Sequence, residues 1–361
     1  MISKTSRKPT NPLPIVQAPI VDKLAYLLPW GVGAAANQER LMLPIKQRIA
    51  SATTAGRCKR AYITGARYRE NFHIVLDSGT EALVQIGALQ PARQHGGIRV
   101  TVNPSRFKAG DADQLNKVMQ RIVGPTYDSL MQKPLLNCVD FAIDITHVRL
   151  ERMLVAYSNA SRHTTFGKRI GKGAHIEGYN FGSVKSDYMA VAYDKHQERV
   201  HRAILELAKQ GVGTEVLKAN VVKQLERVKY APHVVRVEVR GKKLRGLPLC
   251  KLDTLTNRFA RFQFADLTSD GSGLDSLTEA AFRSLCRDKG VKATLELFTH
   301  SKQQQAVNAY WNSRRATWWQ PQSHWLDACA ALRKIGLFPD SAFNGSQPSA
   351  RSGFRRVSSM R

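Results

Sequence analysis

The stretch FGSVKSDYMAVAYDKHQER, Phe181 to Arg199, is the part of this 361-residue chain from which its fold can best be inferred. After a Phe-Gly-Ser turn, residues 188–193 combine aromatic and β-branched side chains, which is typical of a short strand. The following residues place apolar side chains at helical spacing. Tyr193 is therefore expected at a strand-to-helix junction, close in sequence to Lys195 and Glu198.

That position gives Tyr193 a chemical interpretation as a nucleophile. A phenol with a pKa near 10 is a poor nucleophile unless a cation or a metal ion favours the phenolate. Lys195 lies two residues away, and Asp194 and Glu198 are nearby carboxylates that could hold a metal ion. An ordinary strand tyrosine followed by a surface helix is the alternative for this stretch taken alone.

The charge of the chain predicts a polyanionic partner. Fifty-five Lys and Arg residues against 28 Asp and Glu residues give a net charge of +27 and a pI near 10.2. No apolar run approaches the roughly 20 residues that span a bilayer, and the positive charge is spread along the chain rather than gathered in one amphipathic helix. Nucleic acid is therefore favoured over a membrane surface.

The cysteines indicate a reducing compartment. They are odd in number, scattered and without CxxC spacing, which argues against a zinc site or a disulfide framework. We therefore expect a cytoplasmic protein. The five are Cys58, Cys138, Cys250, Cys286 and Cys329.

The hydrophobic pattern predicts an α+β domain with appendages. We expect a flexible basic arm at 1–20, a catalytic domain at 21–265, a smaller mainly helical region at 266–338 and a disordered basic tail at 339–361. Strand patterns occur at 72–76, 81–89, 98–102, 135–145, 188–193 and 233–240. Helical patterns begin at 111 and after 193, and recur near 214–229, 276–288, 302–311 and 322–335.

Two of these strands carry acids on a polar face. One face of 135–145 is apolar, and the other carries Asp140 and Asp144 beside small residues, which indicates a shallow polar floor. In 233–240 the valines alternate with Arg236, Glu238 and Arg240. The alternatives are a solvated antiparallel face for the first strand and a cross-strand ion pair for the second. The apolar face of the first consists of Leu135, Val139, Phe141, Ile143 and Ile145.

Two further segments have competing interpretations. Residues 158–180 are rich in Gly and in basic residues, and we expect a cationic loop that contacts phosphates, with a plain solvated loop as the alternative. A P-loop is excluded because its two glycines are too close and Gly173 stands where Ser or Thr is required. The tryptophans near Arg314 and Arg315 could stack bases, but we favour the core of a small helical region. They are Trp311, Trp318, Trp319 and Trp325.

Three motifs, in this order, resemble those of a known family. They are VDFA (Val139–Ala142), the block GSVKSDYMAVAYDKHQE (Gly182–Glu198) and VRVEVR (Val235–Arg240). Together they resemble the rolling-circle replication initiators of filamentous phages, the gene II type, and the related Rep_trans initiators of small plasmids. The similarity covers roughly residues 70–265 and takes in Ser161–His163 and Leu244–Leu249.

The resemblance implies an antiparallel sheet covered by helices, as in Rep nickases, and an enzyme that nicks one strand at a double-stranded origin. Tyr193 would form a 5′-phosphotyrosine, leave a 3′-OH primer and later rejoin the displaced strand. Asp140 and Glu238 match acids expected to bind Mg²⁺ or Mn²⁺; we assign Glu198 to the same site and Lys195 to catalysis. The basic residues expected to contact DNA are Arg162, Lys168, Arg169, Lys172, Lys185, Arg236 and Arg240.

Some family features are absent. No His-hydrophobic-His triplet occurs, so the metal site of HUH enzymes is not present in its usual form, and Gln197 stands where some relatives have a second tyrosine. With no helicase or Walker motif, a host helicase and polymerase are the expected partners of a protein acting in the bacterial cytoplasm; a homodimer is left open. The alternatives are a relaxase or transposase-like nickase, or a non-enzymatic nucleic-acid-binding protein in which Tyr193, Asp140 and Glu238 need not converge.

Overall fold

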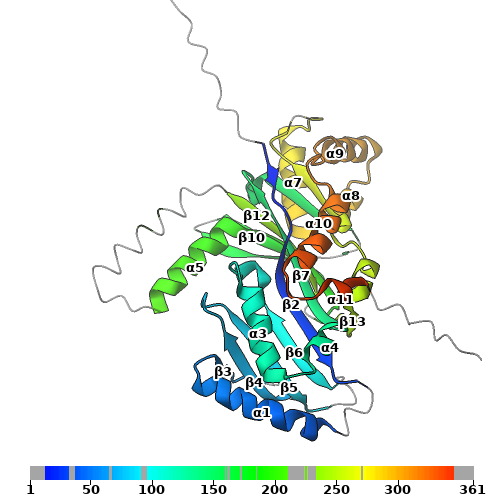
Figure 1. Cartoon of the computed structure of the whole chain (residues 1–361). Helices are drawn as coiled ribbons and strands as arrows, with labels where there is room; N and C mark the ends of the chain where they lie inside the picture. Colours follow the sequence, from blue (N-terminus) through cyan, green and yellow to red (C-terminus); the bar gives the residue numbers. More distant parts are fainter. Residues whose placement is uncertain are drawn as a thin grey trace, which may run out of the picture.

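The computed structural model describes residues 13–31, 37–64, 67–90, 96–158, 160, 163–170, 173–183, 185–209, 223, 226, 233–269 and 271–344. These residues form an α+β structure in which helices cover a large antiparallel sheet, so the predicted class is confirmed (Figure 1). The expected arm at 1–20, the helix at 214–229 and the tail at 339–361 lie largely outside the described residues. None of the helices described is both long and apolar enough to cross a lipid bilayer.

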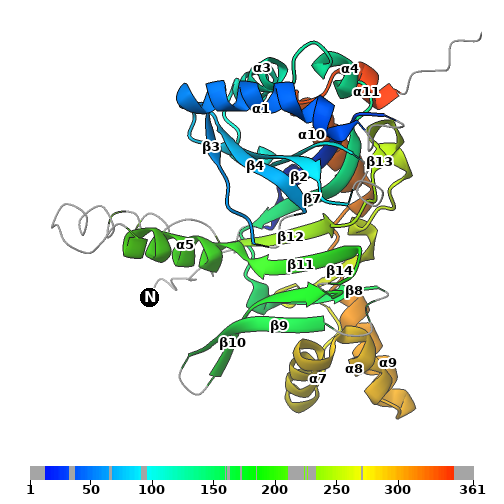
Figure 2. The same cartoon turned by 90° about the horizontal axis from the view of Figure 1, so that it is seen from below.

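The sheet contains twelve of the described strands, in the order β3-β4-β5-β6-β2-β7-β12-β11-β10-β9, with β1 and β13 also paired to β7. Figure 2 shows β12, β11, β10 and β9 following one another away from β7. The strands are β1 (Ile15–Val16), β2 (Ile20–Pro29), β3 (Cys58–Arg60), β4 (Tyr68–Val75), β5 (Glu81–Ala88), β6 (Gly97–Val102), β7 (Leu135–Thr146), β9 (His163–Ile170), β10 (Gly173–Phe181), β11 (Tyr188–Asp194), β12 (Val234–Gly241) and β13 (Leu247–Pro248). A separate pair consists of β8 (Met153–Tyr157) and β14 (Phe262–Asp266).

Helices pack on the apolar face of this sheet and beyond its β9 end (Figure 2). The described helices are α1 (Gln38–Thr54), α3 (Asp111–Val123), α4 (Tyr127–Met131), α5 (Lys195–Lys209), α7 (Ser276–Lys289), α8 (Val291–Leu297), α9 (Ser301–Ser313), α10 (Pro321–Lys334) and α11 (Asp340–Asn344). Short 3₁₀ turns occupy Pro104–Arg106, Leu150–Arg152, Leu249–Thr254 and Phe259–Arg261.

The strand β2 was not predicted, although it runs through the middle of the sheet between β6 and β7 (Figure 1). Residues 13–20, which we assigned to the arm, include β1 and the first residue of β2. The signal was hidden because Leu24–Leu28 is buried on both faces and therefore shows no alternation. The helix α1 was also missed, and it carries Pro44 inside a helical pattern.

Two bulges bend the central pair of strands. Between β2 and β7 the pairing skips Asp22 on one side and Asn137 on the other. Because a bulge shifts the alternation by one residue, Leu136 rather than the predicted Leu135 joins the core face with Val139. The bulge at Asp22 also directs that side chain toward Arg236, to which it is ion-paired.

The prediction of a loop at 158–180 is wrong, because most of this segment is the β9–β10 hairpin at one edge of the sheet. Its glycines and basic residues were interpreted as loop composition. At least one of these glycines has a packing role in the hairpin: a Cβ at Gly178 would overlap the ring of Phe166 and lie 2.7 Å from the Cβ of Tyr193, its partner on β11. A residue with a side chain would therefore displace the Phe166 ring and crowd the tyrosine.

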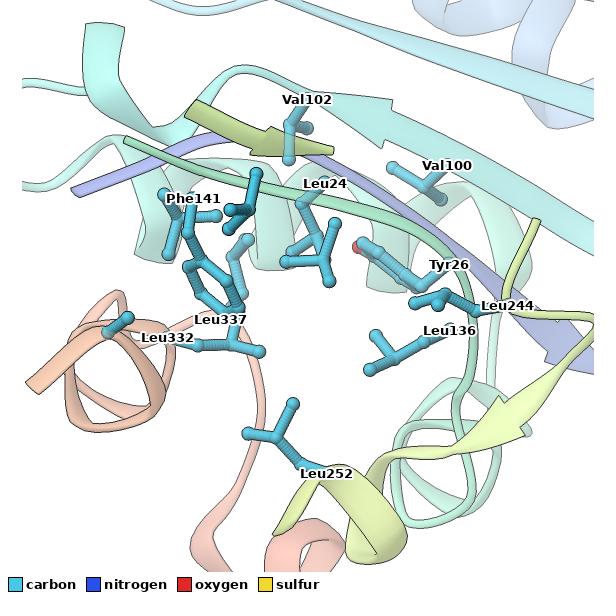
Figure 3. Close-up of a cluster of buried hydrophobic side chains, with 14 of the residues drawn as sticks. Leu24, Tyr26, Val100, Val102, Leu136, Phe141, Leu244, Leu252, Leu332 and Leu337 are labelled. Carbon is cyan, nitrogen blue, oxygen red and sulfur yellow. The ribbon is translucent and has the colours of Figure 1, made fainter. Parts of the chain in front are cut away.

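One hydrophobic core joins the sheet to the C-terminal helices (Figure 3). Tyr26 of β2 packs edge-to-face on Phe338 at 4.8 Å, and Phe141 of β7 packs in the same way on Trp325 of α10 at 5.6 Å. These contacts place α10 and α11 against the middle of the sheet. The buried side chains labelled in Figure 3 are Leu24, Tyr26, Val100, Val102, Leu136, Phe141, Leu244, Leu252, Leu332 and Leu337.

The helices α7, α8 and α9 form a second, smaller cluster with Leu154 and Ala265 of the β8–β14 pair. The region expected at 266–338 is therefore shared between two cores. The helices predicted near 276–288, 302–311 and 322–335 are confirmed as α7, α9 and α10. Trp311 is buried in the smaller cluster, as the prediction of a small helical core requires. Trp319 and Trp325 are instead buried in the larger core with the sheet, and Trp318 is partly buried against it, so that prediction is wrong for these three.

Candidate active site

The polar faces of β7, β12 and β11 form one continuous surface. In the antiparallel register Asp140 lies opposite Arg240, Ala142 opposite Glu238 and Asp144 opposite Arg236, and Arg236 in turn lies opposite Tyr193. Directly paired residues point to the same side of a sheet. The alternation in the sequence therefore predicted correctly that Asp140 and Glu238 emerge on the face opposite the core valines of β12.

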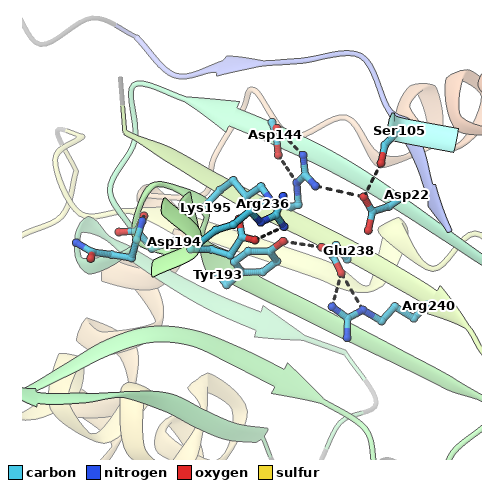
Figure 4. Close-up of polar contacts among 12 residues, drawn as sticks. Asp22, Ser105, Asp144, Tyr193, Asp194, Lys195, Arg236, Glu238 and Arg240 are labelled. Carbon is cyan, nitrogen blue, oxygen red and sulfur yellow. Dashed lines mark hydrogen bonds and ion pairs between the residues drawn. The ribbon is translucent and has the colours of Figure 1, made fainter. Parts of the chain in front are cut away.

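Tyr193 and Glu238 are in direct contact (Figure 4). The Tyr193 hydroxyl donates a hydrogen bond of 2.7 Å to Oε1 of Glu238. Burial raises the pKa of Tyr193 well above its usual range, and the negative charge and hydrogen bond of Glu238 raise it further. The tyrosine is therefore protonated in this arrangement, and any nucleophilic role requires a proton acceptor within reach.

Glu238 is almost completely buried, at 3% exposure, and its second oxygen is also occupied. Oε2 accepts hydrogen bonds from Nε of Arg240 at 2.8 Å and from Nη2 of the same guanidinium. The side chain of Arg240 is 34% exposed, so the guanidinium joins a buried carboxylate to the surface. Tyr193, Glu238 and Arg240 thus form a chain that leads from the phenol to solvent (Figure 4).

Asp140 lies opposite Arg240, next to the Ala142–Glu238 pair along the same two strands, and is 8% exposed. Desolvation raises its pKa to about 6, although Arg240 and Lys23 oppose this shift and Glu238 adds to it. It accepts a long hydrogen bond, 3.5 Å, from the thiol of Cys138. A carboxylate in such surroundings would gain from a cation that arrives with a ligand.

Arg236 holds a second charged cluster beside the tyrosine (Figure 4). Its Nε and Nη2 donate to the two oxygens of Asp144 at 2.6 and 2.8 Å, and its Nη1 is 3.5 Å from Asp22. Ser105 donates to Asp22 at 3.0 Å. These contacts raise the pKa of Arg236 against the effect of its burial, so the guanidinium stays charged.

The first turn of α5 supplies the next charges. Asp194 accepts a hydrogen bond of 3.0 Å from the backbone N–H of Gln197 and so caps the helix. Lys195 is 8% exposed, and its Nζ is 2.7 Å from Glu198 and 5.7 Å from the centre of the Tyr193 ring. Glu198 also pairs with Arg202. The predicted strand-to-helix junction at Tyr193 is confirmed.

The three carboxylates expected to bind a metal ion do not share a site in this arrangement. Glu238 is held by Tyr193 and Arg240, whereas Glu198 is held by Lys195 and Arg202. Within the described ranges, no three His, Cys, Asp or Glu side chains are grouped so that they could hold a metal ion. Hard carboxylate oxygens suit Mg²⁺ or Mn²⁺, but Arg240 and Lys195 already supply the positive charge that such an ion would bring to Glu238 and Glu198.

The structure describes only part of the expected DNA-contacting set. Arg162 and Lys172 lie outside the described residues, and Lys168 and Arg169 belong to β9, whose side chains are not described at these positions. Lys185 is exposed. Arg240 is part of the chain to Tyr193, and Arg236 is engaged by two aspartates. DNA contact by these residues stays a prediction.

Sequence reasoning missed four polar residues near this surface. Asp22 and Lys23 were missed because β2 was not recognised as a strand. Lys243 and Arg245 follow β12 and pair with Asp187 at 3.7 and 2.9 Å, beside the start of β11. The basic run from Lys242 to Arg245 was a signal in the sequence that could have marked them.

The comparisons with known proteins include a likeness to a solved structure. No protein-family model matches the chain, and no curated protein matches it. A solved structure of a rolling-circle replication initiator protein from Geobacillus stearothermophilus aligns over 72% of this chain and 90% of that chain, with 11% sequence identity and a TM-score of 0.34. A TM-score of this size does not establish a shared fold.

Proposed function

We propose that this protein is a replication initiator that nicks one DNA strand at a phage or plasmid origin through Tyr193 and later rejoins the strand. The observation that carries the proposal is the contact between the Tyr193 hydroxyl and the buried Glu238, with Arg240, Arg236 and Lys195 around it. Buried charges that surround a polar nucleophile are a frequent mark of an active site.

The chemistry required is transfer of a phosphodiester to the tyrosine. Such transfers depend on positioning and on neutralising the charge that develops on the phosphate oxygens. Tyr193 lies at the end of a strand, fixed by Gly178 on one side and by Glu238 on the other. Arg240 is partly exposed and is the cation placed to meet a phosphate. The net charge of +27 would bring DNA to this surface.

A requirement for Mg²⁺ or Mn²⁺ belongs to this proposal as a property of the DNA-bound protein. Mg²⁺ is commonly held by one or two carboxylates together with substrate phosphate oxygens. Asp140, buried and next to the row of Glu238, is the carboxylate of this chain that would take part. The proposed partners are origin DNA and, because the sequence lacks a helicase motif, a host helicase and polymerase.

The proposal is tested by trapping the covalent product. Wild-type protein is incubated with Mg²⁺ and supercoiled DNA of the replicon that carries its gene, and protein-linked nicks are detected after denaturation. We expect an adduct with the wild type and none with Tyr193→Phe, which removes one hydroxyl and should leave DNA binding nearly unchanged. Absence of any adduct with the wild type favours the non-enzymatic binding protein. Persistence of the adduct in Tyr193→Phe would show that another residue is the nucleophile, with Tyr188 and Tyr179 as the next candidates.

A further inference from the structure

The contact between Tyr193 and Glu238 has the geometry of an acid and its base. The phenolic oxygen and the carboxylate oxygen are 2.7 Å apart, which is hydrogen-bond distance without an intervening water. Glu238 is 3% exposed, so solvent competes little for this proton. A general base must lie within about 2.6–3.2 Å of the proton donor, and Glu238 meets this condition.

We infer that Glu238 is the proton acceptor that activates Tyr193, and that Arg240 restrains it until a DNA phosphate draws the guanidinium away. This inference rests on the proposed function and assigns a role to Glu238 other than metal binding. Glu238 is the catalytic residue, since it touches the reacting hydroxyl. Arg240 positions Glu238 in the DNA-free protein and contacts a phosphate in the proposed complex.

The proton and the electron pairs can be followed through both directions of the reaction. In nicking, the Tyr193 proton passes to Oε1 of Glu238 while the phenolic oxygen forms the new bond to phosphorus. The bond from phosphorus to the 3′ oxygen breaks, and the leaving oxygen takes its proton from water. In rejoining, the 3′ oxygen attacks the phosphotyrosine and releases its proton to water. The departing phenolate recovers its proton from Glu238, so the carboxylate ends each cycle as it began.

Arg240 gives this base a control that depends on DNA. Two hydrogen bonds from the guanidinium to Oε2 hold the carboxylate in place beside Tyr193. The side chain is 34% exposed, and arginine binds phosphate in the same fork geometry in which it binds carboxylate. A phosphate next to Tyr193 would therefore compete for Arg240 and leave Glu238 free to accept the proton.

Several other charges surround the pair from the elements packed against it. These charges also influence the pH dependence of nicking. The test therefore compares the pH–rate profiles of variants at position 238 with one another and assigns no pKa to a single residue. These groups are Asp140 and Asp144 on β7, Asp22 and Lys23 on β2, Arg236 on β12, and Lys195 and Glu198 on α5.

The experiment measures the single-turnover rate of adduct formation on the same supercoiled replicon DNA, at fixed Mg²⁺, from about pH 6 to about pH 9. Glu238→Gln should be slower by about 10²–10⁴-fold near pH 7, because general-base catalysis contributes that much. Its rate should rise about tenfold per pH unit as ionisation of the phenol replaces the missing base. Glu238→Asp should recover part of the rate. The matched control Glu81→Gln changes an exposed carboxylate elsewhere on the sheet and should behave as the wild type.

Excess Mn²⁺ distinguishes a general-base role of Glu238 from a role as a metal ligand. The loss of a metal ligand can be compensated by a higher metal concentration. Rescue of Glu238→Gln by Mn²⁺ without a steeper pH profile would therefore overturn the inference. A Glu238→Gln rate within about threefold of the wild type would overturn it as well. If Glu238→Gln does not fold, restoration of the Glu238→Asp rate to the wild-type value by Mn²⁺ would overturn it in the same way. A wild type that forms no adduct contradicts the proposed function instead, so the two failures are distinguishable.

Arg240 is tested by the dependence of the same adduct rate on DNA concentration at one pH. If the guanidinium leaves Glu238 for a phosphate, Arg240→Gln should raise the half-saturating DNA concentration and keep most of the rate at saturating DNA, while Arg240→Lys should lie in between. A purely structural role for Arg240 would lower the amount of active protein and leave the half-saturating concentration unchanged. An unchanged half-saturating concentration in well-folded Arg240→Gln would therefore overturn the proposed exchange.

Discussion

The two halves of the large sheet differ in the polar side chains that they carry. In the half made of β4, β5 and β6, Asn71, Gln85 and Arg99 form a hydrogen-bonded row across the strands, in which Gln85 donates to Asn71 at 2.7 Å and accepts from Arg99. In the half made of β7, β12 and β11, the corresponding positions hold buried charges. Asp140, Arg236 and Glu238 are each less than 10% exposed, as is Lys195 where α5 begins.

This difference indicates where function lies, because a buried ion costs more free energy than a hydrogen-bonded amide, and the one charge of the first row, Arg99, is only partly buried. Removing an ion from water costs several kcal/mol even after the protein relaxes, and a hydrophobic pair of similar size would often be more stable. In the first half, Asn71, Gln85 and Arg99 satisfy one another's hydrogen bonds on the polar face. The second half buries more charge than hydrogen bonding of its strands requires, which is expected where charged side chains act on a substrate.

The largest test of this comparison is removal of one partner from the buried ion pair. Arg236→Ala leaves Asp144 uncompensated and should lower the free energy of unfolding by about 3–5 kcal/mol. The matched variant in the other half, Arg99→Ala, loses a charge-assisted bond to the amide oxygen of the buried Gln85 and should cost less, about 1.5–3 kcal/mol. Urea unfolding measures both.

A double variant makes this test specific. Arg236→Met with Asp144→Leu removes both members of this pair, the buried guanidinium and the partly buried carboxylate, and should recover most of the stability lost in Arg236→Ala. If Arg236→Ala and Arg99→Ala cost the same, or if the double variant recovers nothing, the two halves do not differ in the way described.

The next test uses the pH dependence of stability in metal-free protein. The pKa of Asp140 is raised from 3.8 to about 6, so the native state favours the protonated acid. The stabilisation is fully present below about pH 4 and is lost as the pH rises through about 6. Asp140→Asn should therefore gain stability relative to the wild type between about pH 4 and pH 7.5, by on the order of 3 kcal/mol. Nicking should nevertheless fall by orders of magnitude.

Asp77 in the first half provides the control with the opposite sign. Arg57 and Gln114 lower the pKa of this exposed carboxyl, so its contribution to stability is present at neutral pH and is lost as the pH falls through its folded value. Asp77→Asn should thus lose stability relative to the wild type as the pH rises. The same direction of change in both variants would contradict the assigned burial of Asp140.

Much of the second half could be predicted from the sequence, because its strands alternate. Val235, Val237 and Val239 mark one face, and Glu238 falls on the other without further information. The resemblance added the roles of Tyr193 and Asp140. Alternation does not show which hydrogen-bond and ion-pair partners a side chain will have. Glu238 bonds Tyr193 on the neighbouring strand and Arg240 on its own, while Glu198 pairs with Lys195 within the helix. These pairings depend on the reach of the side chains.

Three other parts of the sheet were predicted less well, for physical reasons that lie in particular residues. β2 is buried on both faces from Leu24 to Leu28, so its period of two disappears. The bulges at Asp22 and Asn137 come from long-range pairing and have no local signal here. In the β9–β10 hairpin, Gly178 makes room for Tyr193, whereas in the sequence it counted only as a loop residue.

The smallest expected effect concerns the two edges of the sheet, β3 and β9, which both carry basic residues. Salt weakens DNA binding because each phosphate neutralised by the protein releases counterions, and each lost contact lowers the slope of log K against log salt by about 0.9. Replacing Lys168, Arg169 and Lys172 together by Ala should therefore lower the slope by up to about 2.7 if all three contact phosphates. Removing three positive charges at the other edge, those of Arg57, Lys59 and Arg60, should change the salt slope less. Arg57 and Lys59 are already paired with Asp77 and Glu81. Binding of a labelled duplex from about 50 to 300 mM salt measures both triple variants. Equal slopes in the two would mean that net charge alone attracts DNA and that the edge next to Tyr193 has no special part in binding it.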